Sequence, residues 1–269
     1  MTAIAVTIAG SDSGGGAGIQ ADLKSFSALG VYGASVITAI TAQNTRGVMA
    51  VEDISPAVVT AQIDAVFSDL AVGAVKIGMV SRQETIAAIA SGLKRYGHLA
   101  VIDPVMVATS GDVLLRPDAI ATLKEELLPL GHIVTPNLPE AALMTGRGIA
   151  ESETEASRQA EALLKLGARA VLMKGGHSRG DEAVDILFNG DTPLRLSRPR
   201  VETRNDHGTG CTLSAAIAAG LARRQRLQDA VIAAKAYLHE ALVAAAELKI
   251  GQGRGPVHHF HQWWSPNGN

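Results

Sequence analysis

The sequence has little cysteine, few aromatic residues and almost no net charge. Among 269 residues there is one cysteine, Cys211, so no disulfide can form within the chain, which fits a reducing compartment. Aromatic residues make up 3 %, so the core must be built from aliphatic side chains. The formal net charge is −2 and no run of lysine or arginine occurs, which argues against a nucleic acid or an anionic membrane as a partner.

Patterns that direct a chain into or across a membrane are also missing. Met1–Ile4 carries no basic residue ahead of a hydrophobic run, so we identify no signal peptide. The uncharged stretch Ser25–Thr45 is rich in hydroxyl and amide side chains and is too polar for a spanning helix. Hydrophobic residues make up 47 % and charged residues 19 %, enough to fill a large core. We therefore predict a soluble, cytoplasmic protein.

Short β-branched runs alternate with helical stretches along the chain. This alternation, without long linkers or repeats, predicts one domain over residues 1–269 with an α/β fold: a mostly parallel central sheet with helices on both faces. The expected strands are Ile4–Ala9, Val31–Ile40, Ala74–Ile77, Leu99–Ile102, Ile133–Thr135, Ala170–Met173 and a hairpin over Ala183–Leu196 that turns at Asn189-Gly190.

Several helix boundaries follow from capping patterns. Ser55-Pro56 places an N-cap and a first-turn proline at the start of one helix. Ser81-Arg82-Gln83-Glu84 has the spacing of a capping box. Two long helices are expected to close the chain, over Thr209–Arg223 and Leu227–Leu248.

Polar or functional side chains follow several of the predicted strands. They are Asp12, Met79, Asp103, Asn137 and Lys174. In parallel sheets, ligands bind beyond the carboxyl ends of the strands, so these residues are expected to meet in one site.

The most informative stretch is His207-Gly-Thr-Gly-Cys-Thr212, which leads directly into an apolar helical stripe. A helix start leaves backbone N–H groups unpaired and carries a partial positive charge. Gly208 and Gly210 remove Cβ atoms, so a bulky anion can approach those N–H groups. The loop is thus interpreted as an anion-binding site, and the alternative is a tight turn that only packs well.

Cys211 lies at the same helix start, where a thiol is expected to have a depressed pKa and to serve as a base or nucleophile. The alternative is a buried structural cysteine. A Cys–His hydrolase that uses Cys211 and His207 lacks a third orienting group in the sequence and is disfavoured.

The glycine-rich loop Gly14–Gly18 follows the first strand, as a dinucleotide-binding loop would. Ile19 occupies the last glycine position of G-x-G-x-x-G, and G-x-x-x-x-G-K-[ST] does not occur. A nicotinamide-dependent oxidoreductase is therefore disfavoured, while a non-catalytic binder of a small ligand stays open. The loop still permits close approach of a ligand to the backbone.

Three weaker signals accompany these loops. Asn137 and Glu140 share a helical face, which suits either a water-mediated Mg²⁺ contact or a helix cap. Lys174, followed by two glycines, suits either a phosphate or an exposed turn. The histidines near the C-terminus are expected to belong to a packed segment and not to a metal site; they are His258, His259 and His261.

Taken together, the motifs make the chain resemble the hydroxymethylpyrimidine/phosphomethylpyrimidine kinases of thiamine biosynthesis, within the ribokinase-like fold. The resemblance spans nearly the full length, and it implies a three-layer sandwich. The matching stretches are Ile8–Asp22, Thr38–Asn44, Lys76–Met79, Asp103–Val105, Ser110-Gly111, Thr135–Glu140, Lys174–His177 and His207–Ala216.

The resemblance implies roles for particular residues. The glycine-rich loop would border a pyrimidine, and Gln43 would hydrogen-bond its aminopyrimidine edge. The transferring phosphoryl group would lie over the loop from Gly208 to Cys211, with Lys174 on phosphate. The rest of the pyrimidine pocket would be Gly10, Ala17, Asp22 and Met79; further ATP contacts would be His207, Thr209 and Asn137; and Mg²⁺ with its waters would be held by Glu140 and Asp103.

The implied reaction is transfer of the γ-phosphoryl group of MgATP to 4-amino-5-hydroxymethyl-2-methylpyrimidine, and then to its monophosphate. Sugar kinases of this fold usually carry Asp where Cys211 stands. Cysteine is typical of the pyrimidine branch and of some vitamin B6 kinases, so a pyridoxine or pyridoxal kinase is the alternative. One departure is Asp206, where this branch commonly has Thr. The resemblance also suggests a homodimer.

Overall fold

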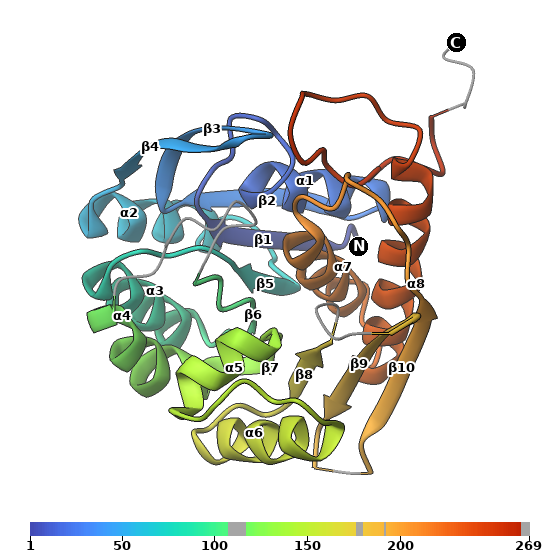
Figure 1. Cartoon of the computed structure of the whole chain (residues 1–269). Coiled ribbons are helices and arrows are strands. Elements are labelled where there is room, and N and C mark those ends of the chain that lie inside the picture. Colours follow the sequence, from blue (N-terminus) through green and yellow to red (C-terminus); the bar gives the residue numbers. More distant parts are fainter. Residues whose placement is uncertain (107–116, 176–179, 191, 265–269) are drawn as a thin grey trace.

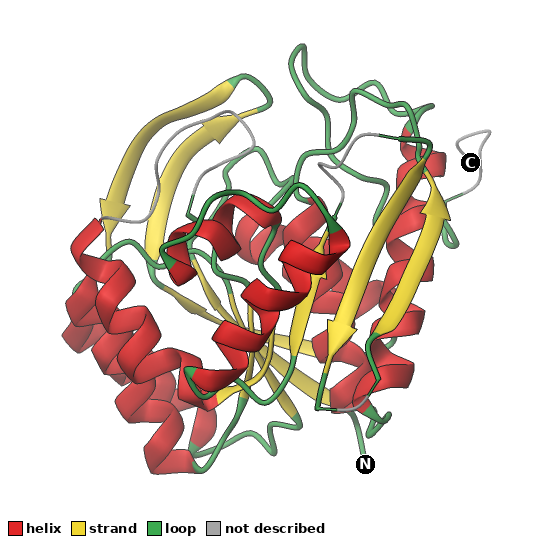
Figure 2. Ribbon diagram, turned by 60° about the horizontal axis from the view of Figure 1, so that its bottom comes forward, coloured by secondary structure: helices red, strands yellow, loops and turns green. Residues whose placement is uncertain are grey.

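We describe the protein from a computed structural model, which describes residues 1–106, 117–175, 180–190 and 192–264. Its largest sheet has eight strands in the order β10-β9-β8-β7-β6-β5-β1-β2 (Figures 1 and 2). These strands are β1 (Ile4–Ala9), β2 (Tyr32–Ile37), β5 (Ala74–Ile77), β6 (Ala100–Ile102), β7 (Gly131–Val134), β8 (Val171–Lys174), β9 (Glu182–Phe188) and β10 (Leu194–Pro199).

Six neighbouring strands of this sheet, from β8 to β2, pair in parallel. β9 runs antiparallel to both β8 and β10, so it is the reversed strand. The mostly parallel α/β sheet is therefore confirmed, and so is the hairpin on either side of Asn189-Gly190.

Two helical layers cover the sheet (Figure 2). One layer holds α1 (Gly18–Ala28), α7 (Thr209–Ala222) and α8 (Leu227–Ala245), so the last helix ends before the predicted Leu248. The other layer contains α2 (Pro56–Phe67), α3 (Gln83–Tyr96), α4 (Pro117–Thr122) with the π and 3₁₀ turns Leu123–Leu127 and Leu128–Leu130, α5 (Leu138–Thr145) and α6 (Glu153–Lys165).

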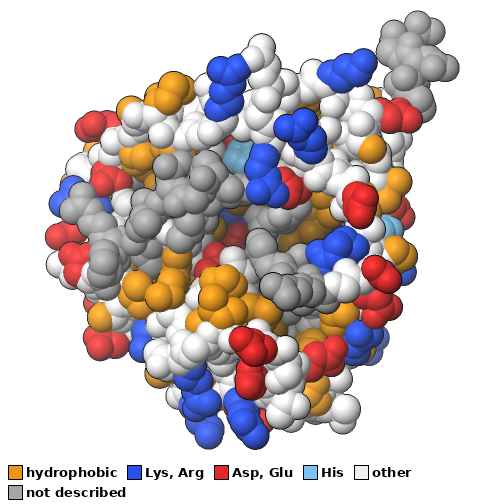
Figure 3. Space-filling view, in the orientation of Figure 1, with side chains coloured by type: hydrophobic (Ala, Val, Ile, Leu, Met, Phe, Trp, Pro, Cys, Tyr) orange, Lys and Arg blue, Asp and Glu red, His pale blue; other side chains and the backbone are white. Residues whose placement is uncertain are grey.

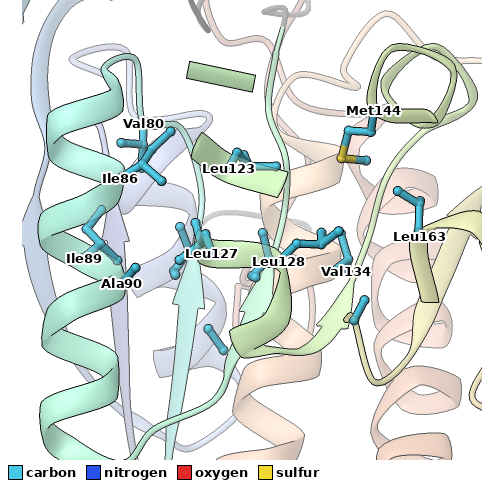
Figure 4. Packing of buried hydrophobic residues seen from close by; sticks show 14 of the residues in the cluster. Val80, Ile86, Ile89, Ala90, Leu123, Leu127, Leu128, Val134, Met144 and Leu163 are labelled. Carbon is cyan, nitrogen blue, oxygen red and sulfur yellow. The ribbon is translucent and has the colours of Figure 1, made fainter. Parts of the chain in front are cut away.

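Alternate residues of the central strands enter different cores, because successive side chains of a strand point to opposite faces. On β6, Ile102 packs in the core beneath α3, whereas Val101 packs beneath α7. The core on the α3 side consists mainly of branched aliphatic side chains, together with methionine, alanine and phenylalanine (Figure 4). The core on the α7 side is rich in alanine, which allows α7 to approach the sheet closely. Strands buried on both faces explain the hydrophobic runs in the sequence.

Of the two capping patterns, one is confirmed and one is wrong. The Ser55 hydroxyl accepts a hydrogen bond from the Val58 N–H, and Pro56 opens α2. The predicted capping box at Ser81 does not form, because the hydroxyl of Ser81 donates to Asp53 instead. Arg82 is the N-cap residue of α3 and its side chain caps no N–H group. The hydroxyl of Ser81 thus binds a residue remote in sequence, Asp53, in place of the N–H groups at the start of α3.

The predicted strand Val31–Ile40 is in fact two strands. β2 ends at Ile37, and after Thr38 the chain enters β3 (Ala39–Asn44), which pairs with β4 (Gly47–Asp53) in a separate antiparallel hairpin. Thr38 sits where β1 ends: its N–H donates to Ala9 O at 3.0 Å and its hydroxyl to Met79 O at 2.9 Å. These bonds hold the chain as it leaves the large sheet.

No helix in the described part of the chain has the length and apolar character needed to cross a membrane.

Candidate active site

The polar residues that follow the parallel strands meet at one edge of the sheet, as predicted. Lys174 Nζ lies 2.7 Å from Asp103 Oδ1 and 3.8 Å from Glu140 Oε2. Asn137 forms a β-bridge with Lys174, and the Gly10 N–H donates to Met79 O at 3.2 Å. Figure 3 shows this face hollowed near its middle, with acidic side chains exposed in the hollow.

The loop before α7 is built as an anion site. Gly208 is the N-cap residue, with φ +82°, and α7 starts at Thr209 as predicted. The N–H groups of Gly210 and Cys211 make no hydrogen bond to any residue that the structure describes. A Cβ on Gly210 would lie 3.4 Å from both Lys174 Nζ and Asp103 Oδ2. Gly210, whose N–H group is unpaired, therefore lies beside the Lys174 cation, an arrangement that suits an anion such as a phosphate.

The glycine-rich first loop is wrapped around the carboxylate of Asp12. Its Oδ1 accepts the Gly14 N–H at 2.8 Å, and its Oδ2 accepts the N–H groups of Gly16 and Ala17 at 3.0 and 2.8 Å. The side chain of Asp12 is buried and also accepts His207 Nε2–H at 2.9 Å. Burial alone would raise the pKa of Asp12, but the His207 hydrogen bond and the loop N–H groups lower it below its ordinary value.

Sequence reasoning missed the role of Asp12 as the internal anion of this loop. An Asp two residues before a glycine does signal a local side-chain-to-backbone turn, and the Gly14 contact could have been foreseen from it. The bond to His207 could not, because 195 positions separate the two residues in the chain.

Gln43 reaches the same place from β3. Its amide Nε2 lies 3.4 Å from His207 Nε2, and its Oε1 accepts the Thr41 hydroxyl at 3.3 Å. The predicted pyrimidine contact Gln43 and the predicted nucleotide contact His207 are thus neighbours. Gly10 and Met79 also adjoin, since a Cβ on Gly10 would lie 2.8 Å from Met79 Sδ.

Asp22, predicted to complete the pyrimidine pocket, is fully buried in this structure. Its Oδ2 lies 2.8 Å from Lys76 Nζ and accepts the Thr7 hydroxyl at 2.6 Å, while its Oδ1 has no hydrogen-bond partner. Burial by itself would lower the pKa of Lys76, but the Asp22 carboxylate raises it, whereas burial raises the pKa of Asp22 in spite of the Lys76 cation. The carboxylate of Asp22 therefore lies beneath the residues that line the candidate site, and its predicted contact with substrate stays a prediction.

The cluster around Lys174 combines one cation with two buried carboxylates. Asp103 also accepts the hydroxyls of Thr135 and Ser214, both at 3.3 Å. Burial would raise the pKa of Asp103, yet Lys174 lowers it, so Asp103 is the ionised partner. Glu140 pairs less closely with Lys174, and burial raises its pKa to about 7. One carboxylate is thus committed to the cation, and the other titrates near neutrality.

Asn137 and Glu140 form the helix cap that was one of their two interpretations. Asn137 Oδ1 accepts the Glu140 N–H at 2.8 Å, and Glu140 Oε2 accepts the Asn137 N–H at 2.7 Å. The capping box fixes the Glu140 carboxylate at the start of α5, beside Lys174.

The predicted depressed pKa of Cys211 is wrong. Cys211 is partly exposed, yet its thiol is enclosed deeply enough that desolvation raises its pKa to about 11. The nearby Lys76 opposes this rise but does not overcome it. The thiol is therefore protonated at neutral pH, and the helix start does not activate it in this state.

The C-terminal histidines pack against the helices, as predicted. His259 Nε2 lies 3.1 Å from the Thr212 hydroxyl, and the Tyr237 hydroxyl donates to His259 O at 2.7 Å. Within the described residues, no group of three or more histidine, cysteine and acidic side chains has an arrangement that could hold a metal ion. Two further stretches of the resemblance, Ser110-Gly111 and His177, lie outside the described residues.

A mostly parallel sheet, unpaired N–H groups at a helix start and a lysine–carboxylate cluster between them define a kinase of the ribokinase-like fold. Comparison with known proteins agrees. The chain belongs to the phosphomethylpyrimidine kinase family, whose family model matches residues 12–258.

Individual relatives place the chain more closely. It is 75 % identical, over 98 % of its length and 99 % of the relative, to the hydroxymethylpyrimidine/phosphomethylpyrimidine kinase of Rhizobium meliloti. The crystal structure of phosphomethylpyrimidine kinase from Clostridium difficile is 50 % identical, with a TM-score of 0.79, over 89 % of this chain and 99 % of that one. Pyridoxal kinase from Staphylococcus aureus, solved with AMP-PCP and pyridoxal, is 32 % identical with a TM-score of 0.89, over 98 % and 95 %.

Proposed function

We propose that this kinase transfers the γ-phosphoryl group of ATP to 4-amino-5-hydroxymethyl-2-methylpyrimidine, and then to the resulting monophosphate, in thiamine biosynthesis. The observation that carries the proposal is the juxtaposition of the Gly210 and Cys211 N–H groups with Lys174. Donors aimed at the transferring group stabilise the charge that develops there. Phosphoryl transfer depends mainly on such positioning and charge stabilisation.

ATP is the nucleotide that the site fits. The unpaired N–H groups at the start of α7 receive the terminal phosphate, and Lys174 binds it from the side of β8. We infer that the remaining nucleotide contacts come from residues near the start of α7 and beside Lys174: His207, Thr209 and Asn137. The pyridoxal kinase of Staphylococcus aureus, which shares the fold, was solved with an ATP analogue.

The pyrimidine alcohol binds beside the glycine-rich loop and β3, which are joined by hydrogen bonds between the Ser13 hydroxyl and the Gln43 backbone. Gln43 hydrogen-bonds the aminopyrimidine edge, and Gly10, Ala17 and Met79 form the walls of the pocket. Asp22 supports this wall from behind through Lys76. The 5-hydroxymethyl oxygen then attacks the γ-phosphorus atom, which is held over the loop from Gly208 to Cys211. We call this loop the anion loop.

Mg²⁺ fits the carboxylate oxygens of Glu140 and Asp103, since hard cations prefer oxygen ligands and Mg²⁺ keeps several of its waters. When bound, it would neutralise negative charge on the phosphates. Glu140 is the more available ligand, because Asp103 is paired with Lys174 at 2.7 Å.

Cys211, in its thiolate form, accepts the proton of the attacking hydroxyl as the new P–O bond forms and the bond from the γ-phosphorus to the departing ADP breaks. Because burial raises the pKa of Cys211 to about 11, only a small fraction of the enzyme carries this thiolate at neutral pH, so the base contributes less than a group ionised at neutral pH would. We expect Cys211→Ala to lower kcat by about 100-fold without changing the affinity for ATP. Cys211→Asp, which restores the residue usual in sugar kinases of this fold, should retain more activity than Cys211→Ala. Near-wild-type turnover by Cys211→Ala would assign catalysis to the backbone N–H groups alone.

The experiment that tests the proposed function is mass spectrometry of the products after incubation with the pyrimidine alcohol and MgATP. We expect a monophosphate followed by a pyrophosphate. Parallel kcat/KM values for pyridoxal address the alternative kinase, and Gln43→Ala should reduce the value for the pyrimidine more than the value for pyridoxal. Higher kcat/KM for pyridoxal, or no phosphorylated pyrimidine, would contradict the proposal.

We further propose that the enzyme acts in the cytoplasm as a homodimer. The β3–β4 hairpin supports this assembly, because apolar side chains stand exposed on it: Ile40 by 53 %, Met49 by 69 % and Val51 by 43 %. Sedimentation of wild-type protein and of Met49→Lys tests the dimer, and the substitution should shift the equilibrium towards monomer.

A further inference from the structure

The chain that follows α8 returns across the loops of the candidate site. We call residues 250–257 of this segment the C-terminal strap. In Figure 1 it belongs to the red loop that lies beside the tip of the blue β3–β4 hairpin. Near its end it pairs with His207: the His207 N–H donates to Gly255 O at 3.0 Å, and the Val257 N–H to His207 O at 3.4 Å.

The strap holds the tip of the β3–β4 hairpin through Thr45. The Arg254 N–H donates to Thr45 O at 2.9 Å, and the N–H groups of Gln252 and Gly253 donate to the Thr45 hydroxyl at 3.2 and 3.1 Å. A Cβ on Gly253 would overlap with Thr45 O, so only glycine, which lacks a Cβ, lets the strap backbone pass this close to the hairpin tip. Thr45 stands two residues after Gln43.

The same arginine also holds the segment before the anion loop. Arg254 Nε donates to Asp206 Oδ1 at 2.8 Å, and its Nη2 pairs with Asp206 Oδ2, so the contact is bidentate. Asp206 directly precedes His207. Arg254 thus gives the Asp206 carboxylate a charged partner.

Arg254 therefore links two parts of the site that are remote in sequence. On one side its backbone N–H binds the hairpin that carries Gln43, and on the other its guanidinium binds the residue before His207, so the ion pair with Asp206 holds the backbone that contacts the hairpin. The side chains of Gln43 and His207 consequently meet, with their Nε2 atoms 3.4 Å apart. We propose that Arg254 is a positioning residue, which sets the distance between the bound alcohol and the phosphoryl group over the anion loop. The inference rests on the proposed function.

The expected effect on catalysis exceeds the expected effect on folding. The side chain of Arg254 is 56 % exposed and that of Asp206 is 28 % exposed, and ion pairs at such positions contribute little to stability. A misplacement of the reacting groups by about 1 Å, in contrast, can lower a rate by about 100-fold. Loss of the pair should therefore leave a folded enzyme whose two substrates are poorly aligned.

The test is a double-mutant cycle on Arg254→Gln and Asp206→Asn. Each single variant should lower kcat/KM for the pyrimidine alcohol by about 10- to 100-fold through both kcat and KM, because alignment and binding suffer together. The affinity for AMP-PCP should stay within about twofold, and Tm should fall by less than about 4 °C. The double variant should be no worse than either single one, and Arg254→Lys should recover part of the loss.

Arg226→Gln is the matched control, because Arg226 makes a bidentate pair of the same kind with Asp229, at 2.7 and 3.2 Å, at the start of α8. It should leave kcat/KM unchanged. Wild-type kcat/KM in Arg254→Gln, an equal loss in Arg226→Gln, or additive losses in the double variant would overturn the inference.

Failure of the proposed function gives a different result. In that case the wild-type enzyme leaves the pyrimidine unphosphorylated, and the cycle is measured with pyridoxal as the alcohol. Hydrogen exchange serves as a readout that needs no substrate. Arg254→Gln should speed exchange at the hairpin tip, residues 44–47, and unchanged exchange there would contradict the link.

Discussion

The molecule contains two glycine-rich loops that look alike in sequence and differ in what their N–H groups do. In the first, the N–H groups of Gly14, Gly16 and Ala17 are bound by the carboxylate of Asp12. In the second, the N–H groups of Gly210 and Cys211 have no partner among the described residues. The first loop carries its own anion, and the second is left ready to receive one.

The difference shows that glycine content alone does not identify a phosphate site. What decides is whether an internal acceptor already satisfies the backbone donors. The two loops also depend on each other, because Gly208 packs against Gly16 and His207 binds Asp12. The first loop, whose N–H groups are bound by Asp12, thus supports the second loop, whose N–H groups are unpaired.

The largest effect is expected when the contact between the two loops is broken. In Gly208→Ala the new methyl group would overlap with the carbonyl oxygen of Gly16, in addition to the strain of a positive φ. We expect loss of kinase activity and a destabilisation of several kcal/mol, at least about 3, in urea unfolding. Gly30→Ala is the control, since Gly30 also has a positive φ but has open space around it, and should cost about 1 kcal/mol. Equal costs for the two variants would refute the packing argument.

The next effect concerns the internal anion. Asp12→Asn removes a buried charge that accepts four hydrogen bonds, and we expect a loss of about 3 kcal/mol in the free energy of unfolding. Asp229→Asn, which removes an exposed partner of Arg226, should cost less than about 1 kcal/mol. The pH dependence gives a second readout.

Because the pKa of Asp12 is lowered on folding, its stabilisation is present above its ordinary value of 3.8. It is lost as the pH falls through the lower pKa of the folded state. Asp12→Asn should therefore flatten the acid limb of the stability curve. An unchanged acid limb would show that Asp12 does not supply this stabilisation.

A smaller effect is expected in the open loop. Gly210→Ala places a methyl group at ordinary contact distance, 3.4 Å, from Lys174 Nζ and Asp103 Oδ2, so the fold should tolerate it. The methyl group would instead occupy space needed by the phosphate, and kcat should fall by about tenfold or more while Tm stays within about 2 °C. Full activity in Gly210→Ala would place the phosphate elsewhere.

The smallest effect is a pH dependence at Glu140. Burial raises the pKa of Glu140 to about 7 from an ordinary 4.5. Between these two pH values the folded protein therefore binds a proton that the unfolded protein does not. The free energy of unfolding consequently falls as the pH rises from about 4.5 to about 7. In the proposed role the carboxylate must be ionised to hold Mg²⁺, so below pH 7 the Mg²⁺ concentration for half-maximal activity should rise by about tenfold per pH unit. Glu140→Gln should remove this limb. A wild-type profile that is flat between pH 6 and 8 would argue against the assignment.

The sequence by itself determined the features that depend on neighbouring residues. Alternating strands and helices predicted the mostly parallel sheet, because strands buried on both faces are hydrophobic throughout. The cap at Ser55, the hairpin around Asn189-Gly190 and the helix that starts at Thr209 also follow from local patterns. The meeting of residues such as Asp103 and Lys174 followed from one rule, that parallel strands end at a common edge.

Only the tertiary structure decided the features that depend on burial or on remote partners. The raised pKa of Cys211 comes from desolvation, which a helix-start argument does not include. Ser81 donates to Asp53 instead of capping its helix, and Arg254 joins Thr45 and Asp206, which are remote in sequence. Sequence spacing gives no measure of such distances, because packing of the helices on the sheet sets them.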